Sequence, residues 1–482
     1  MNRKIVFSIT GRLLEAISLI LLLPMIVALI YKEKCFSAFL ITALISLAVG
    51  VTLRLITRKC SSSLYAREGF LIVALAWVSA SLVGCLPFII SGEIPNFFDA
   101  FFETVSGFTT TGASIVTNVE SLSHGILFWR SFTHWIGGMG VLVFMVAFIS
   151  NISDKAIHIL RAEMPGPVVG KLVPRAKDTS KVLYIMYIVM TVVQIILLWC
   201  GDMNLFEAVI HSFGTAGTGG FGLKSSSIGG YSAYSQWVIT VFMMIFGVNF
   251  NLYYLLLMRR FKAVFKSTEL WTYIGIALTS TVIIAINISH LYPTVGETIR
   301  QSAFQVSSIM TTTGYATTDF NLWPQLSKSL LLILMFIGAC AGSTAGGLKI
   351  SRIVILFKMG LREIKRMIHP RSVGSVKFEG KDVDDHTKRS VTTYFAVYMM
   401  CFFVIFLLVS FEGAPFDFEA NFSAVTACFN NIGPGFGVVG PAGSFAEYSE
   451  FSKAVLSFAM LFGRLEIFPL LIALIPSTWK RK

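Results

Sequence analysis

Charged side chains are scarce in this chain. Asp, Glu, Lys and Arg make up 13% of its 482 residues, whereas soluble globular domains carry about a quarter. The seven cysteines show no CxxC spacing, so the sequence indicates neither a disulfide framework nor a cysteine metal site. It also contains no HExxH pair, no P-loop and no GxGxxG after a strand-like run. These absences argue against a soluble enzyme and against a nucleotide cofactor bound by this chain.

Apolar residues dominate instead. They make up 55% of the sequence, and the mean hydropathy is +0.74. A membrane-spanning helix needs about 20 mainly apolar residues. Ten runs are candidates for such helices: 13–31, 35–56, 69–91, 125–150, 182–200, 236–258, 270–291, 329–348, 391–411 and 454–476. We therefore predict a multi-pass integral membrane protein.

The net charge of +13 is distributed unevenly among the gaps between these runs. Lys and Arg are concentrated in alternate gaps, at 3–12, 54–67, 155–181, 259–266, 352–389 and 480–482. The other gaps hold fewer basic residues and are richer in Asp and Glu. This alternation is the positive-inside pattern. It predicts cytoplasmic termini, and it accounts for the positive charge without nucleic-acid binding.

Four glycine loops interrupt the apolar sequence: TTTGAS (109–114), GTGGFG (217–222), TTTGYAT (311–317) and NIGPGFG (431–437). We align their central glycines as Gly112, Gly220, Gly314 and Gly433. The second loop has four glycines, so its central residue stays open. An acid lies thirteen or fourteen residues before the glycine at Asp99, Glu207 and Glu419, whereas the third copy has Gln301, with Glu297 the nearest acid. Matching registers of this kind indicate internal repeats.

Each repeat is interpreted as a membrane helix, a half-length pore helix, a filter loop and a second membrane helix. We predict an all-α integral membrane protein with two N-terminal helices and four such repeats in pseudo-fourfold arrangement around one pore. All four loops would lie on the outer side. The predicted boundaries are an extension at 1–66 and repeats at 67–178, 179–267, 268–384 and 385–482, the third of which includes a basic cytoplasmic segment.

The composition of the loops suits a cation filter. Backbone outside helices is tolerated at membrane depth only where it is buried in protein or lines an aqueous path. Carbonyl and hydroxyl oxygens without a carboxylate ring favour a weakly hydrated monovalent cation over calcium or magnesium. The predicted filter residues are Thr110, Thr111, Gly112, Thr218, Gly219, Gly220, Thr312, Thr313, Gly314, Asn431, Ile432 and Gly433. Residue types alone do not decide between potassium and sodium.

The loops, together with FFETVSGFTTTGAS (101–114), HWIGGMG (134–140) and FGRLEIFP (462–469), resemble the Trk/Ktr/HKT superfamily of cation transporters. The resemblance covers essentially the whole chain and is closest to the ten-helix Trk-type subunits. In that superfamily a glycine at every filter position goes with potassium selectivity, and a serine in the first repeat goes with sodium preference. The resemblance therefore implies potassium as the substrate ion and the bacterial inner membrane as the location.

The resemblance also implies partners. Membrane subunits of this superfamily work as homodimers on a cytoplasmic ring of RCK-type nucleotide-binding subunits, with NAD or ATP/ADP as candidate ligands of that ring. No cofactor is expected in this chain itself. The basic segment Lys358–Arg389 would contact either such a ring or anionic membrane lipid.

Two features inside apolar runs are candidates for a gate. The glycine-rich stretch GACAGSTAGGLK (338–349) should break a helix just inward of the filter. It is either a flexible flap or a close-packed helix crossing, and the resemblance favours the flap. The residues concerned are Gly338, Gly342, Ser343, Thr344, Gly346, Gly347 and Lys349. Lys349 alternatively snorkels to the membrane surface as the last residue of a span.

Arg464 is the second gate candidate. It lies in the middle of an apolar run, where a charge costs at least ~2.5 kcal/mol. The residue is either a pore-facing positive barrier, which the resemblance favours, or one half of an ion pair. Glu466 is a poor partner because it points to another face of the helix.

Two other functions are alternatives to ion conduction. A secondary transporter of a small solute or cation, with proton or sodium symport, would need a midplane pocket, and a broken spanning helix is evident only in the third repeat. An intramembrane enzyme would need a catalytic constellation, and we find none of adequate specificity. His134 and His211 lack metal-ligand spacing and are interpreted as packing or interfacial residues.

Overall fold

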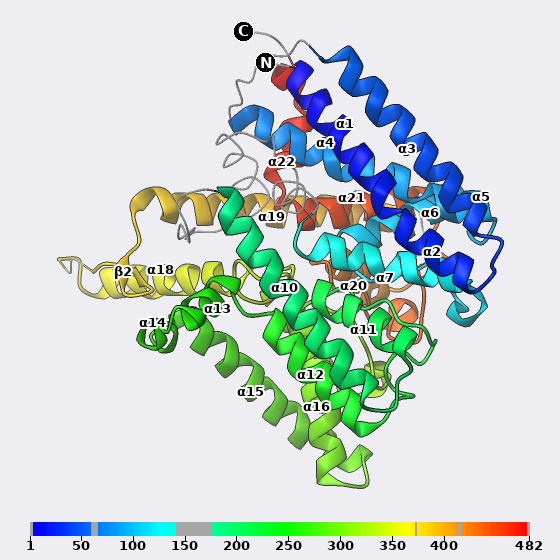
Figure 1. Cartoon of the computed structure of the whole chain (residues 1–482). Coiled ribbons are helices and arrows are strands. Elements are labelled where there is room, and N and C mark those ends of the chain that lie inside the picture. The colour runs from blue at the N-terminus through cyan, green and yellow to red at the C-terminus, as the bar shows by residue number, and fades with distance from the viewer. Residues whose placement is uncertain (1–2, 59–65, 141–175, 372–373, 412–415, 480–482) are drawn as a thin grey trace.

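The computed structural model of the chain describes residues 3–58, 66–140, 176–371, 374–411 and 416–479 (Figure 1). Within these ranges the only strands are β1 (Lys377–Phe378) and β2 (Lys381–Asp382), which pair antiparallel with Lys377 opposite Asp382. The remaining regular structure is helical, which confirms the predicted all-α class. The end of the predicted run 125–150 and the basic residues at 155–175 and 480–482 lie outside the described residues.

Six long apolar segments in the described ranges meet the length and composition of membrane spans. They are α1 (Arg3–Ile20) with α2 (Leu22–Ile30), α3 (Phe36–Ile56), α4 (Ala66–Gly84) with α5 (Leu86–Ser91), α10 (Ala176–Trp199), α15 (Thr268–Ile288) and α19 (Asp385–Phe411). Pro24 and Pro87 account for the two small breaks, because proline has no N–H and clashes with the preceding turn. Leu44, Leu278 and Leu407 are more than half exposed on these helices, as lipid-facing residues are.

Each repeat adds a half-length helix and a second helix to its first span. The pore helices are α6 (Phe97–Phe108), α11 (Leu205–Gly217), α16 (Val295–Met310) and α20 (Phe418–Phe429). The second helices are α7 (His124–Gly138), α12 (Ala233–Phe246) with α13 (Phe250–Leu257), α17 (Gln325–Ile337) with α18 (Ile350–Ile368), and α21 (Glu450–Arg464) with α22 (Phe468–Leu474). The short elements are α14 (Phe261–Phe265), η1 (Val119–Ser121), η3 (Ser289–Leu291), η4 (Phe320–Leu322), η5 (Gly437–Val439) and η6 (Pro476–Trp479).

The four repeats form a closed cycle. Each second helix packs on the pore helix of the following repeat: α7 on α11, α12 on α16, and α17 on α20. The fourth, α21, packs on α6 of the first repeat and so returns to the start (Figure 1). This connectivity is the predicted pseudo-fourfold arrangement. The N-terminal pair α1 and α3 lies outside the cycle, and α1 packs against α4.

The second helices are interrupted more often than the sequence suggested. The third repeat is broken between Ile337 and Ile350, as predicted. In the second repeat α12 and α13 meet at a bend of 89°. In the fourth, α21 ends at Arg464 and α22 starts at Phe468, with Glu466 and Ile467 at positive φ between them. The expectation of a break in the third repeat alone was therefore wrong.

Polar contacts between elements mark two opposite ends of the molecule. At one end Arg67 donates to the carbonyl of Ser477 at 3.0 Å, and the N-terminal end of α1 contacts Trp479. The other end holds the pore-helix N-termini, where Lys453 pairs with Asp99 at 2.6 Å and Lys328 with Glu419 at 2.9 Å. These two lysines belong to the gaps that we assigned to the outer side. Their positive charge is balanced by first-turn acids of the pore helices.

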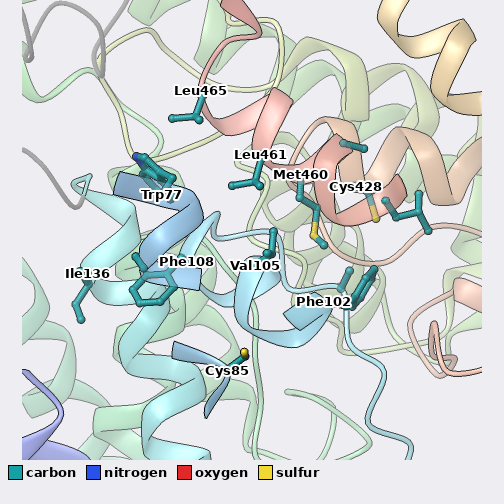
Figure 2. Packing of buried hydrophobic residues seen from close by; sticks show 14 of the residues in the cluster. Trp77, Cys85, Phe102, Val105, Phe108, Ile136, Cys428, Met460, Leu461 and Leu465 are labelled. Atoms are coloured by element: carbon teal, nitrogen blue, oxygen red, sulfur yellow. The ribbon is translucent and has the colours of Figure 1, made fainter. Parts of the chain in front are cut away.

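The largest apolar cluster of the described residues packs the pore helices α6 and α20 among α1, α4, α7, α19 and α21 (Figure 2). In Figure 2, Phe102 and Val105 of α6 lie near Met460 and Leu461 of α21. Such packing, rather than exclusion from water, holds helices together in a membrane. The cluster therefore fixes the pore helix of the first repeat against the second helix of the fourth.

Candidate functional site

Each pore helix begins at a side-chain cap. The capping residues are Asn96, Asn204, Thr294 and Asp417, each of which accepts a backbone N–H from the first turn. The first turns carry the acids Asp99, Glu207, Glu297 and Glu419, which suit the positive end of a helix. Because α16 starts at Val295, Glu297 occupies the first turn and supplies the acid that Gln301 does not.

All four pore helices end in the same hydrogen-bonded turn. The N–H groups of Thr111, Gly219, Thr313 and Ile432 each donate to the carbonyl five residues earlier, at 2.8 to 2.9 Å. The residue before each of them is left-handed, with φ of 55° to 56°: Thr110, Thr218, Thr312 and Asn431. This is a Schellman motif, in which that residue is usually glycine. A residue with a side chain costs about 1–2 kcal/mol there, so the same strained turn recurs at all four loops.

The loops that follow close a ring. A Cβ added to Gly112 would lie within 3.0 Å of the carbonyl oxygen of Gly219, which belongs to the next repeat. A Cβ added to Gly220 would likewise lie within 3.0 Å of the carbonyl oxygen of Thr313. The corresponding oxygen is that of Ile432 for Gly314 and that of Thr111 for Gly433. The four carbonyls therefore come from equivalent positions of the four repeats, and each packs against the central glycine of the preceding repeat.

The central glycines are required for two reasons. Their φ values are +81° at Gly112 and Gly220, +83° at Gly314 and +103° at Gly433, a region that side chains strongly disfavour. Each also leaves no room for a Cβ beside the neighbouring carbonyl. Gly220 is thereby identified as the central glycine of the second loop, which the sequence left open.

A cavity of about 300 Å³ opens onto this ring, and all four central glycines line it. Arg130, Lys224, Ser225 and Glu447 are among its polar lining residues. On its edge, Ser225 donates its N–H and hydroxyl to Glu120 at 2.8 and 2.7 Å. The hydrogen bonds from Ser225 hold the pKa of Glu120 below its usual value. The cavity is thus a vestibule with both polar and apolar walls, formed by the loops that follow the four pore helices.

A buried ion pair supports the first loop and was not predicted from the sequence. Glu103 on α6 and Arg130 on α7 are 1% and 2% exposed, and their charged atoms approach to 2.6 Å. Glu103 also accepts the Ser114 hydroxyl at 3.0 Å and the Ile115 N–H at 3.0 Å. A buried carboxylate stays charged only when it is paired and hydrogen-bonded. The pair therefore links Ser114 and Ile115, the residues that leave the first loop, to α6 and α7.

The glycine-rich segment 338–349 lies directly against the ring. It has no helix, and Gly338, Gly342 and Gly347 have positive φ. The Gly346 N–H donates to the hydroxyl of Thr312 at 2.7 Å, and a Cβ on Gly346 would meet the carbonyl of Asn430. The segment thus touches the pore-helix ends of the third and fourth repeats.

The same segment fills the break in the second repeat. Cys340 donates its N–H to the carbonyl of Gly247 at 3.1 Å, and Phe250 donates to that of Gly342 at 3.0 Å. Within the segment, Ser343 donates its hydroxyl to the carbonyl of Cys340 at 2.6 Å. These contacts account for the bend between α12 and α13, since the freed backbone groups bond to the inserted segment.

Arg464 joins this segment to the first repeat. Its Nη1 donates to the carbonyl of Thr344 at 2.7 Å, and its Nη2 donates to the carbonyls of Gly137 and Gly138, the latter at 2.8 Å. Glu466 instead forms an ion pair with Arg352. The guanidinium is therefore held by backbone carbonyls of the segment 338–349 and of α7.

Lys349 does not extend to the surface. It is 8% exposed, and its ammonium donates to the carbonyl of Ala345 within the segment. Lys349 is the residue that immediately precedes α18, and its φ is 75°. The snorkelling interpretation was therefore wrong.

The amino-acid sequence of the chain matches a known family. A family model described as "TrkH: Cation transport protein" matches residues 36–481. The chain belongs to the TrkH family. It is 40% identical over the full length of both chains to the Trk system potassium uptake protein TrkH of Escherichia coli K12, and 37% identical over 99% of both to TrkG of the same strain.

A solved structure agrees with the family assignment. The crystal structure of the potassium transporter TrkH from Vibrio parahaemolyticus matches with a TM-score of 0.89 at 35% identity and covers all of both chains. The resemblance noted from the motifs and the predicted fold are therefore confirmed. Membership of the TrkH family assigns the chain to cation transport.

Proposed function

We propose that this TrkH-family chain conducts potassium inward across the bacterial inner membrane. The observation that carries the proposal is the closed ring of carbonyls from Thr111, Gly219, Thr313 and Ile432. Its relatives in Escherichia coli are potassium uptake proteins by name. A ring of carbonyls can replace the hydration shell of a potassium ion.

The ion path follows from the charges around this ring. A cation enters the vestibule of about 300 Å³ and loses water where four helix C-termini add negative potential. With the termini in the cytoplasm, a membrane potential of 100 mV contributes about 2.3 kcal/mol per charge toward entry. The predicted filter residues bind the ion through backbone oxygens.

We further propose that the segment 338–349 is the gate and that Arg464 holds it closed. Three contacts support this role: Gly346 with Thr312 of the filter, Gly342 with the broken second helix, and Thr344 with Arg464. Because Arg464 also bonds to α7, its release would free the segment on one side. The glycines at positive φ allow the segment to move.

Regulation from the cytoplasm would reach the gate through the β1–β2 turn. Glu379 in this turn accepts the Ser267 hydroxyl at 3.0 Å and the Glu269 N–H at 2.9 Å, at the start of α15. The Glu269 carboxylate in turn accepts the Ala341 N–H of the gate at 2.7 Å. We also propose that the chain forms a homodimer that binds an RCK-type nucleotide-binding subunit. NAD or ATP/ADP would be bound by that subunit. The basic helix α18 would contact either the subunit or membrane lipid.

Rubidium flux tests the proposal. Purified protein in liposomes should take up rubidium under a potassium diffusion potential, and excess sodium should compete poorly. A symporter coupled to protons or sodium is the second candidate, since the breaks in three second helices are a feature of such transporters. Uptake that needs a proton or sodium gradient at zero potential would favour the symporter, and no rubidium uptake under either condition would refute both.

A further inference from the structure

The second filter loop lacks the side chains that brace the first and third. The hydroxyls of the Thr109–Thr111 pair lie 2.8 Å apart, and those of the Thr311–Thr313 pair are equally close. The equivalent positions of the second loop are Gly217 and Gly219, which have no side chain for such a bridge. The carbonyl of Gly219 is nevertheless one of the four in the ring, so its position must be fixed in another way.

The imidazole of His134 fills the missing space. A Cβ on Gly219 would lie within 3.0 Å of three ring atoms of His134, namely Cγ, Nδ1 and Cδ2. A Cβ on Gly217 would meet the backbone carbonyl of His134. His134 lies on α7 of the first repeat and is fully buried. The second loop is glycine-rich because a histidine from the neighbouring repeat occupies the side-chain positions.

His134 is itself held in place. Its Nδ1 lies 2.8 Å from the carbonyl oxygen of Gly107 on α6, so Nδ1 carries the proton and donates. Its ring packs on Phe221, the residue after Gly220, with 4.2 Å between the centroids. Arg130, one turn earlier on α7, also lies over the Phe221 ring at 4.2 Å. One imidazole therefore joins α6, α7 and both sides of the Gly220 turn.

We propose that His134 is a positioning residue of the cation filter, whose ring fixes the Gly219 carbonyl. The inference rests on the proposed function of the carbonyl ring. The first and third loops are braced within themselves, whereas the second is braced by α7. Because Arg464 bonds to Gly137 and Gly138 at the end of the same helix, a shift of α7 would reach the gate and this corner of the filter together.

The test compares rubidium and sodium uptake in liposomes by four variants. His134→Ala empties the space and should lower the rubidium-to-sodium ratio at least tenfold. His134→Asn keeps a donor for Gly107 but loses the ring, so the ratio should fall by a smaller factor. Gly219→Ala should also lower the ratio, because its Cβ meets the imidazole. In the double variant His134→Ala/Gly219→Ala the clash is absent, and the ratio should recover toward the parent value.

His124→Asn is the matched control, because it makes the same change at the start of the same helix, where the imidazole contacts Glu33 and Tyr31 instead of a filter loop. Its ratio should equal that of the parent. Thermal unfolding of each variant in detergent separates loss of selectivity from loss of fold. An unchanged ratio in folded His134→Asn, or losses that simply add in the double variant, would overturn the inference. A parent protein without selective uptake would instead refute the proposed function.

Discussion

Replacing Gly112 with serine tests the ring most directly. Gly112 has a φ of +81°, and a Cβ there would meet the carbonyl oxygen of Gly219 closer than 3.0 Å. The serine must therefore either bear the backbone strain, about 1–3 kcal/mol, or push the Gly219 carbonyl out of the ring. Either outcome changes the geometry of the filter where the first and second repeats meet.

The expected magnitude follows from the size of that perturbation. A loss of about 1.4 kcal/mol in discrimination corresponds to a tenfold change in a binding ratio. We therefore expect Gly112→Ser to lower the rubidium-to-sodium uptake ratio about tenfold or more. Total cation uptake should persist, because the carbonyls of Thr111, Thr313 and Ile432 stay in the ring.

Gly92→Ser supplies the matched control for this experiment. Gly92 ends α5 with a φ of +78°, but nothing lies within 4 Å of an added Cβ. Its substitution carries the same backbone strain without contact to a carbonyl, so only stability should fall. If folded Gly112→Ser keeps the parent ratio, or Gly92→Ser loses it equally, the assignment of Gly112 to the filter is wrong.

Three further predictions concern the gate, the buried pair and the rim of the vestibule. Arg464→Ala removes charge-assisted hydrogen bonds worth about 1.5–3 kcal/mol each, so rubidium uptake at fixed potential should rise several-fold; a lower uptake by folded protein would contradict the gate. Glu103→Gln leaves Arg130 without its countercharge and should cost about 3–5 kcal/mol of stability, measured by denaturant unfolding, with a smaller cost when Arg130→Met is added. The lowered pKa of Glu120 stabilises the fold above the usual glutamate pKa and ceases to do so as pH falls through the lower folded value. The difference in unfolding temperature between the parent and Glu120→Gln should therefore shrink as the pH falls below the usual glutamate pKa, and a difference that stays constant through that fall would argue against the Glu120–Ser225 link.

Short-range pattern was enough to predict the repeats. In the first, second and fourth repeats the first-turn acid, the pore helix and the central glycine lie within about fourteen residues of one another. Helix caps and turns depend on neighbours at that distance. The break at Gly338 was likewise visible as a local glycine-rich stretch. The bends at 247–249 and 465–467 carry no comparable signal, since Ile467 is β-branched and would not be expected at a φ of 67°.

The contacts that hold the filter in place could not be predicted from the sequence, because they join residues that are far apart in the chain. Glu103 and Arg130 lie on two separate helices, and His134 and Gly219 belong to different repeats. His134 was interpreted as a packing or interfacial residue because nothing near it in sequence indicates what its ring contacts. Arg464 was recognised as unusual, but its carbonyl partners on α7 lie 326 and 327 residues away.

The sequence by itself determined that the chain is a helical membrane protein with four pore repeats, because hydropathy, caps and glycine turns act over a few residues. Only the tertiary structure decided which glycine is central in the second loop, what holds each carbonyl, and where Arg464 binds. Those features depend on close approaches between repeats, and in a packed interior a single Cβ or imidazole decides whether such an approach is possible.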